Sequence, residues 1–140
     1  MRRSARCGGE GRGTILNVSS VLAFQPGPWR ANYAATKAYI TSLTLALHEE
    51  LRGSGVTATA LCPGLTRTEF HARSGQDMSR VPSWLFQSAE QVARAGLAAA
   101  AAGKPLCVPG WHNRVAVAFY RHAPVSLVRR VGDVLMRRFR

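Results

Sequence analysis

The chain has 140 residues, of which 46% are hydrophobic and 19% are charged, and its formal net charge is +12. This length predicts one domain at most, and the hydrophobic content excludes an intrinsically disordered protein. No apolar segment approaches the roughly 20 residues of a membrane-spanning helix, and the basic start lacks the apolar run of a signal peptide.

The cysteines and histidines indicate no metal site. The three cysteines are odd in number and far apart, which predicts no disulfide framework and favours a reducing, cytoplasmic setting. The histidines have no partners at metal-ligand or catalytic-triad spacing. The cysteines are Cys7, Cys62 and Cys107, and the histidines are His48, His71, His112 and His122.

The positive charge gathers at the two ends of the chain. Residues 1–12 hold four arginines against one glutamate, and residues 111–140 hold seven arginines against one aspartate. Basic ends favour an anionic partner such as a membrane or a nucleic acid, although a solvated arginine-rich face gives the same pattern. Aromatic residues do not interleave with basic ones on any expected strand, and no DNA-reading helix motif is present. We therefore expect no nucleic-acid partner.

The first half of the chain predicts a strand, a helix and a second strand. Residues 1–12 are polar and predict a flexible basic segment. Thr14–Val18 is a short, mostly apolar run that predicts a buried strand. Asn32–Arg52 has apolar residues at helical spacing and is followed by a glycine, so it predicts a long helix. Val56–Leu61 predicts the second strand.

The second half predicts one capped helix and one more short strand. Residues 65–87 show no clear period and predict an irregular segment. Ser88 and Gln91 have the spacing of a capping box, which predicts a helix over Ala89–Ala102. Leu106–Val108 predicts a third short strand.

The end of the chain, residues 113–140, predicts helix with a break at Pro124. Apolar residues in its last part fall on one stripe flanked by arginines: Val128, Val131, Leu135 and Phe139. Such a stripe is typical of an interfacial membrane helix, and equally of a helix that packs on the sheet or on a second subunit.

The order strand, helix, strand predicts a parallel sheet covered by helices. Because such crossovers are right-handed, both strands end at the same edge of the sheet. Ser20, which follows the first strand, and Pro63–Gly64, which follows the second, are therefore expected to meet where ligands bind in open α/β sheets.

The helix after Ser20 carries Tyr33 and Lys37, which are four residues apart and share one face. A lysine ammonium one turn from a phenol favours the phenolate and makes the phenol a better proton donor. A strand ending in a hydroxyl group, followed by this helix, can build a proton-transfer site.

These residues resemble the catalytic constellation of the short-chain dehydrogenase/reductase family, in particular its ketoacyl- and hydroxysteroid-reductase-like bacterial members. Asn17-Val18-Ser19-Ser20, then Tyr33 thirteen residues after Ser20, then Lys37, then Cys62-Pro63-Gly64 all stand at family spacing. The resemblance covers residues 13–110. It implies the last three strands of a doubly wound, Rossmann-like parallel sheet with flanking helices, followed by a basic helical tail over residues 111–140.

The resemblance also implies roles. Tyr33 would be the general acid in carbonyl reduction and the base in the reverse direction, and Lys37 would also hold the nicotinamide ribose. Ser20 would orient the substrate carbonyl. Hydride would pass between NAD or NADP, with NADP favoured, and a carbonyl or alcohol.

Two further segments match family features. Pro63, Gly64, Thr66 and Thr68 match the P-G-x-x-x-T loop that meets the nicotinamide and the cofactor phosphates. Trp84, Leu85 and Phe86 stand where the family carries a substrate lid, and their apolar character favours a lipophilic acyl, steroid or retinoid-like carbonyl substrate. Core packing is the alternative for these three residues.

The glycine-rich turn that binds the cofactor pyrophosphate is absent from the sequence. The sequence therefore resembles only the second half of the family fold, and we expect a truncated chain that is inactive alone. The alternative is a non-catalytic half-domain that acts as an interaction or dimerisation module. We expect a homo-oligomer through the Asn32–Arg52 helix and peripheral membrane contact by the basic tail.

Overall fold

A computed structural model of the chain describes residues 12–67 and 81–137. Most of the predicted N-terminal segment, together with Thr68 and Phe139, lies outside the described residues.

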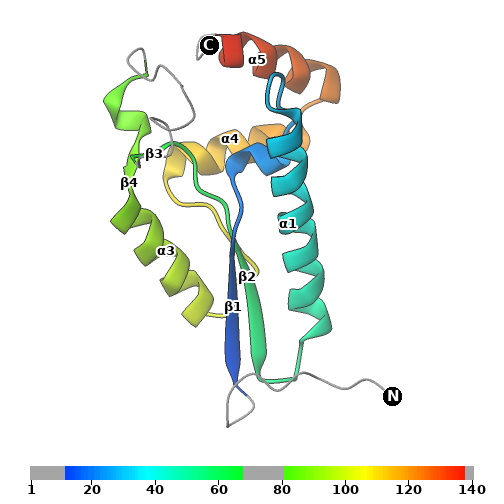
Figure 1. Cartoon of the computed structure of the whole chain (residues 1–140), viewed down its shortest axis with the longest axis vertical. Helices are drawn as coiled ribbons and strands as arrows, with labels where there is room; N and C mark the ends of the chain where they lie inside the picture. Colours follow the sequence, from blue (N-terminus) through cyan, green and yellow to red (C-terminus); the bar gives the residue numbers. More distant parts are fainter. Residues whose placement is uncertain (1–11, 68–80, 138–140) are drawn as a thin grey trace.

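The described residues form a three-stranded parallel sheet between helices (Figure 1). The strands are β1 (Gly13–Val18), β2 (Val56–Leu61) and β5 (Leu106–Cys107), in the order β1-β2-β5. β1 and β2 pair in parallel along their whole length, from Gly13 opposite Val56 to Val18 opposite Leu61. The predicted α/β class and parallel sheet are confirmed, and β1 forms one edge of this sheet.

The central strand β2 is buried because helices cover both of its faces. Ala58, Thr59 and Ala60 are fully buried, and small side chains there let the helices approach. α1 (Ala31–Glu50) lies on one side of the sheet and α3 (Ala89–Ala101) on the other (Figure 1). A parallel strand covered on both faces loses the polar alternation of a half-exposed strand.

α1 is attached to the sheet mainly through small polar side chains. Thr44 is fully buried, and its Oγ1 accepts a hydrogen bond from Asn17 Nδ2 at 2.9 Å. His48 Nδ1 lies 2.8 Å from Ala58 O on β2. The opposite side of α1 exposes Tyr39 and Leu43. The predicted long helix is therefore confirmed to within two residues at each end, and it carries an uncovered apolar surface in this structure.

α3 begins with the predicted capping box. Ser88 Oγ accepts from Gln91 N at 3.1 Å, and Gln91 Oε1 accepts from Ser88 N at 3.0 Å. The helix is turned so that Gly96 faces β2, where a Cβ atom would lie 2.6 Å from Leu61 Cδ2. Glycine at this position permits the close packing of α3 on the sheet.

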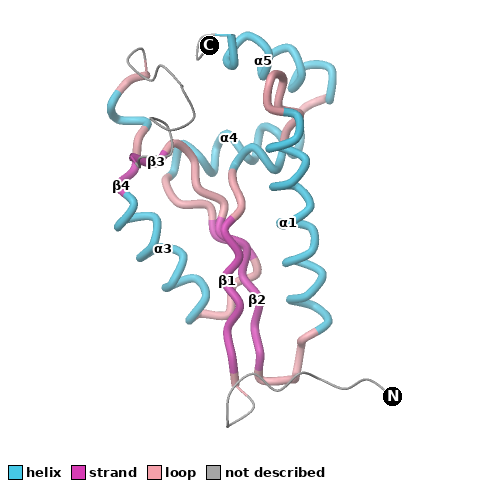
Figure 2. The backbone as a smooth tube through the Cα atoms, in the orientation of Figure 1, coloured by secondary structure: helices cyan, strands magenta, loops and turns pink. Residues whose placement is uncertain are grey.

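The predicted helical tail consists of α4 (Trp111–His122) and α5 (Val125–Arg137). α4 lies across the end of the sheet where the strands end and contacts the segment after β1, and α5 lies beyond it (Figure 2). Val128 of α5 is buried and Val131 is half-buried, while Gly132 approaches Pro26. This part of the predicted apolar stripe therefore faces the protein, which favours packing over membrane contact for these residues.

The sequence missed several short elements. A 3₁₀ turn, η1 (Val21–Phe24), follows β1, and another, η2 (Ser83–Leu85), stands in the segment predicted to be irregular. In the same segment β3 (Thr66–Arg67) pairs in parallel with β4 (Gln87–Ser88). Elements of two to four residues are too short to show a hydrophobic period.

Within the described ranges, we find no helix with the length and apolar character needed to cross a membrane.

Candidate active site

The two strand ends are joined by backbone hydrogen bonds that continue the pairing of β1 with β2. Ser19 N donates to Leu61 O at 2.7 Å, and Val21 N donates to Pro63 O at 3.0 Å. Ser20 therefore lies beside the segment between Leu61 and Pro63. The sequence predicted this meeting of the two strand ends.

The neighbouring serines make different contacts. Ser19 Oγ donates to Lys37 O at 2.8 Å and lies 2.7 Å from Thr41 Oγ1, so this side chain fastens α1 to the end of β1. Ser20 Oγ instead accepts from Leu22 N at 3.2 Å and caps η1. Both serines are buried. Because its oxygen acts as acceptor in this bond, Ser20 still has its hydroxyl proton to donate to another group.

Tyr33 and Lys37 lie one turn apart on α1 at the same end of the sheet. Lys37 Nζ donates to Val18 O, the last carbonyl group of β1, at 3.0 Å. The same nitrogen lies 5.6 Å from the centroid of the Tyr33 ring. The lysine side chain thus links the tyrosine ring to the strand that ends beside Ser20.

Cys62 is fully buried behind these residues. Burial raises the pKa of the Cys62 thiol above its ordinary value of 9.0, and hydrogen bonds from Thr41 and Ser19 oppose the shift only in part. Its sulfur lies 3.7 Å from Thr41 Oγ1. Since the thiolate is the nucleophilic form, a buried neutral thiol is structural.

Gly64 stands against a side chain that the sequence analysis did not single out. A Cβ atom on Gly64 would lie 2.6 Å from both Cγ and Nδ2 of Asn113. Asn113 is buried at the start of α4, and its Nδ2 donates to Pro109 O at 2.7 Å. The resemblance assigned the space beside Gly64 to a cofactor, and in this structure Asn113 occupies it. Its only sequence signal is its spacing of four residues from Val117, which predicts that both share the buried side of α4.

The remaining predicted site residues lie around β3 and η2. Thr66 Oγ1 donates to Gly64 O at 3.2 Å. Trp84 is 63% exposed and meets the His112 ring edge-on, with 6.0 Å between ring centroids. Leu85 is half-buried, and Phe86 lies under the Arg67 guanidinium at 5.8 Å.

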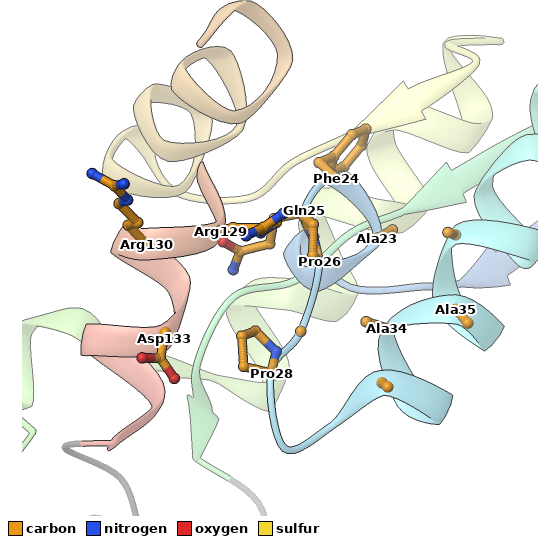
Figure 3. A pocket seen from close by; sticks show the side chains of 13 residues that line it. Ala23, Phe24, Gln25, Pro26, Pro28, Ala34, Ala35, Arg129, Arg130 and Asp133 are labelled. Carbon is orange, nitrogen blue, oxygen red and sulfur yellow. The ribbon is translucent and has the colours of Figure 1, made fainter. Parts of the chain in front are cut away.

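A cavity in the described part of the chain lies beside the segment that follows Ser20 but does not contain the predicted catalytic residues. Its volume is about 830 Å³, and it lies between the loop after η1, the first turns of α1, and α5 (Figure 3). Gln25 Oε1 is buried in its wall without a hydrogen-bond partner among the described residues. Burial raises the pKa of Tyr120 on α4, and a hydrogen bond from the Gln25 side chain lowers it by a smaller amount. The lining includes neither Ser20 nor Tyr33 nor Lys37.

Lys37 is placed to hold one end of a dinucleotide cofactor, whereas Asn113 occupies the space beside Gly64. Lys37 keeps two of its three ammonium protons beyond the bond to Val18 O, which suits it to hold ribose hydroxyl groups. Within residues 12–67 and 81–137, no glycine-rich turn leads from a strand into a helix to hold a pyrophosphate. In the same ranges, no group of three His, Cys, Asp or Glu residues is placed to hold a metal ion.

The order and parallel pairing of the three strands, with helices on both sides, are those of part of a Rossmann-like α/β sheet. The sequence profile of short chain dehydrogenases matches residues 5–79. The protein belongs to the short-chain dehydrogenase/reductase family.

Individual relatives show the same similarity. The chain is 33% identical over 87 residues to the 3-oxoacyl-[acyl-carrier-protein] reductase FabG of Thermotoga maritima, an alignment that covers 59% of this chain and 35% of the reductase. Among solved structures, a short-chain dehydrogenase from Sphingobium yanoikuyae in complex with NADPH matches with a TM-score of 0.64 and 28% identity, over 90% of this chain and 45% of that one.

A 7β-hydroxysteroid dehydrogenase structure matches with a TM-score of 0.74 over 89% of this chain and 49% of that one, at 22% identity, which supports the fold alone. The chain therefore spans about a third to a half of the length of these relatives.

Proposed function

We propose that this protein takes part in the transfer of hydride between a nicotinamide cofactor and a carbonyl or alcohol substrate. The observation that carries the proposal is the placement of Tyr33 and Lys37, one turn apart on α1, at the strand end beside Ser20. Membership of the short-chain dehydrogenase/reductase family supports it.

The proposed proton transfer uses these three side chains. The Ser20 hydroxyl donates a hydrogen bond to the substrate oxygen and keeps its proton, while the serine oxygen accepts from Leu22 N. Tyr33 gives its proton to that oxygen as the carbonyl is reduced, and it takes the proton back in the reverse direction. The Lys37 ammonium, 5.6 Å from the centroid of the Tyr33 ring, lies close to the negative charge that this transfer leaves on the tyrosine. A bound reduced nicotinamide supplies the hydride.

We propose NADP in preference to NAD as the cofactor, held at its nicotinamide end by Tyr33, Lys37, Pro63, Gly64, Thr66 and Thr68. The NADPH in the Sphingobium yanoikuyae relative supports this preference. Asn113 would have to move, or share the space, for a cofactor to approach Gly64 closely.

We further propose a lipophilic substrate covered by Trp84, Leu85 and Phe86. The large exposed fraction of Trp84, 63%, supports a covering role, because a core tryptophan would be buried. The 3-oxoacyl substrate in the name of the Thermotoga maritima relative agrees with a lipophilic carbonyl compound.

The chain covers only part of the length of its relatives, and this limits what it does alone. Because it spans about a third to a half of its relatives, we propose that residues 13–110 are the second half of the catalytic domain and residues 111–140 its helical tail. On this proposal the chain is inactive unless the pyrophosphate-binding half is present. The alternative, a non-catalytic interaction module, would use the free edge of β1 and the exposed side of α1.

Three further proposals concern the surroundings of the site. Exposed Tyr39 and Leu43 support a homo-oligomer through the Asn32–Arg52 helix. The free thiols of Cys62 and Cys107 support a reducing, cytoplasmic setting. The arginine-rich tail supports peripheral contact with a membrane.

The test is to isolate the native product from its own organism, measure its intact mass, and assay NADPH-dependent reduction of lipophilic ketones. We expect a species larger than 15.2 kDa that contains these peptides and is active. A native 15.2 kDa product that folds but binds no cofactor would refute the enzyme proposal and support the module.

A further inference from the structure

We propose that the outer side of α4, together with Trp84, docks on an anionic lipid bilayer. We call this surface the aromatic face, and it consists of Trp84, Trp111, Val115 and Phe119. The proposal deepens the peripheral membrane contact proposed above and rests on it, but it does not depend on catalysis.

Within residues 12–67 and 81–137, the side chains of the aromatic face are exposed. Trp111, Val115 and Phe119 follow one another at intervals of four residues, and they are 70%, 61% and 38% exposed. His112 joins Trp84 to this row, since its ring meets those of Trp84 and Trp111 edge-on at 6.0 Å and 5.9 Å.

The opposite side of α4 already has its partner within the protein. Asn113 and Val117 are buried there, and the helix contacts η1 beside Ser20. The exposed row is therefore not the core-facing side of a displaced helix. Figure 2 shows α4 at the end of the molecule where the strands end, so the helix that carries the aromatic face lies at the same end of the sheet as the candidate active site.

The charges around the aromatic face select an anionic partner. Exposed Arg114 and Arg121 follow one edge of the row on α4. No acidic residue stands between Glu90 and Asp133 in the sequence, and Asp133 pairs with Arg137 at 2.9 Å. A second copy docked face to face would bring arginines against arginines, whereas anionic headgroups neutralise them. Exposed tryptophan beside arginine is typical of residues at a membrane interface.

This surface differs from the one that the sequence indicated. In the predicted stripe on the last helix Val128 is buried and Leu135 is 37% exposed, and we place the membrane contact on α4 and η2 instead. A bilayer on the aromatic face would place lipid beside Trp84 and the strand ends. A lipophilic substrate could then enter the site without passing through water.

The test is flotation of the complete 140-residue chain with vesicles of phosphatidylcholine alone and of phosphatidylcholine mixed with phosphatidylglycerol. We expect binding to the anionic vesicles only, with weaker binding at high salt. Arg114→Gln and Arg121→Gln should each lower the partition coefficient about fivefold. Trp111→Ser should also weaken binding. Arg52→Gln, an exposed change just after α1, and Leu97→Ser, an exposed change on α3, are the matched controls and should bind as the wild type does.

A second readout does not depend on how well the variants fold. Tryptophan fluorescence of the wild-type chain should shift to the blue with anionic vesicles and be quenched by brominated lipid. Equal binding to both vesicle types, no binding, or equal losses in the controls would overturn the proposal. So would a lipid-free dimer that Trp111→Ser dissociates, because a second copy would then cover this face. None of these outcomes uses the cofactor, so the result is separate from the success or failure of the catalytic proposal.

Discussion

Replacing Gly64 with alanine tests the contact that the structure places beside the Pro63–Gly64 turn. Gly64 is not among the glycines with positive φ, so its conformation is open to alanine. The obstacle is space, because the new Cβ atom would lie 2.6 Å from Cγ and Nδ2 of Asn113. Asn113 is 7% exposed and is held by its bond to Pro109 O, so it cannot move without loss.

The expected cost combines two effects. Overpacking in a buried site costs about 1–3 kcal/mol. If Asn113 moves away, the lost bond to Pro109 O costs about 1–3 kcal/mol more. We therefore expect Gly64→Ala to lower the free energy of unfolding by about 2–6 kcal/mol, which is large for a single methyl group.

The assay is urea unfolding followed by circular dichroism, carried out as a double-mutant cycle with Asn113→Ala. The second substitution removes the crowded atoms, so the cost of Gly64→Ala should fall by about 1–3 kcal/mol in that background. Gly53→Ala is the control, because Gly53 has φ +79 and no atom within 4 Å of its Cβ position. Its cost, about 1–2 kcal/mol of backbone strain, should be the same in both backgrounds. Equal costs of Gly64→Ala in both backgrounds would refute the steric account.

Three more predictions concern the supports of the site. Ser19→Ala removes one buried and one part-buried hydrogen bond and should lower the free energy of unfolding by about 1–3 kcal/mol. Ser20→Ala loses only the η1 cap and should cost about 1 kcal/mol; urea unfolding that ranks the two variants in reverse would contradict these roles. Burial raises the pKa of Cys62 above 9.0, so above that pH the unfolded thiol releases its proton while the native one keeps it, and the free energy of unfolding falls as pH rises. Urea midpoints measured on either side of pH 9 should show a smaller decline in Cys62→Ala than in the wild type, and an unchanged decline would be inconsistent with the burial. Ser88→Ala breaks the capping box and should cost about 1 kcal/mol in the same assay, with Ser83→Ala in exposed η2 nearly neutral.

The elements that the sequence predicts well are those whose local pattern and tertiary role agree. Val56–Leu61 and the long helix from Ala31 have clear length, period and end signals, and the Ser88–Gln91 box is a purely local contact. The meeting of Ser20 with Pro63 follows from the handedness of the crossover rather than from any single residue.

The rest depends on contacts between distant segments. Asn113 reaches Gly64 only because α4 lies over the strand ends, and nothing near Gly64 in the sequence encodes that. The sequence left two partners open for the last helix, a membrane and a protein surface, because its arginine-flanked stripe suits both. The burial of Val128 favours the protein surface at that residue. The pairing of Thr66–Arg67 with Gln87–Ser88 joins two strands of two residues each, which have no period to detect.

The most direct test of the proposed chemistry is the kcat/KM of the Tyr33→Phe variant in the native protein, with NADPH and a lipophilic ketone. The matched control is Tyr39→Phe, a change at an exposed tyrosine on the same helix. Loss of the proton donor should lower kcat/KM about 10²- to 10⁴-fold. The affinity for an unreactive analogue that lacks the carbonyl group should change little. A Tyr33→Phe enzyme that retains the rate of Tyr39→Phe would contradict the assignment of Tyr33 as the proton donor.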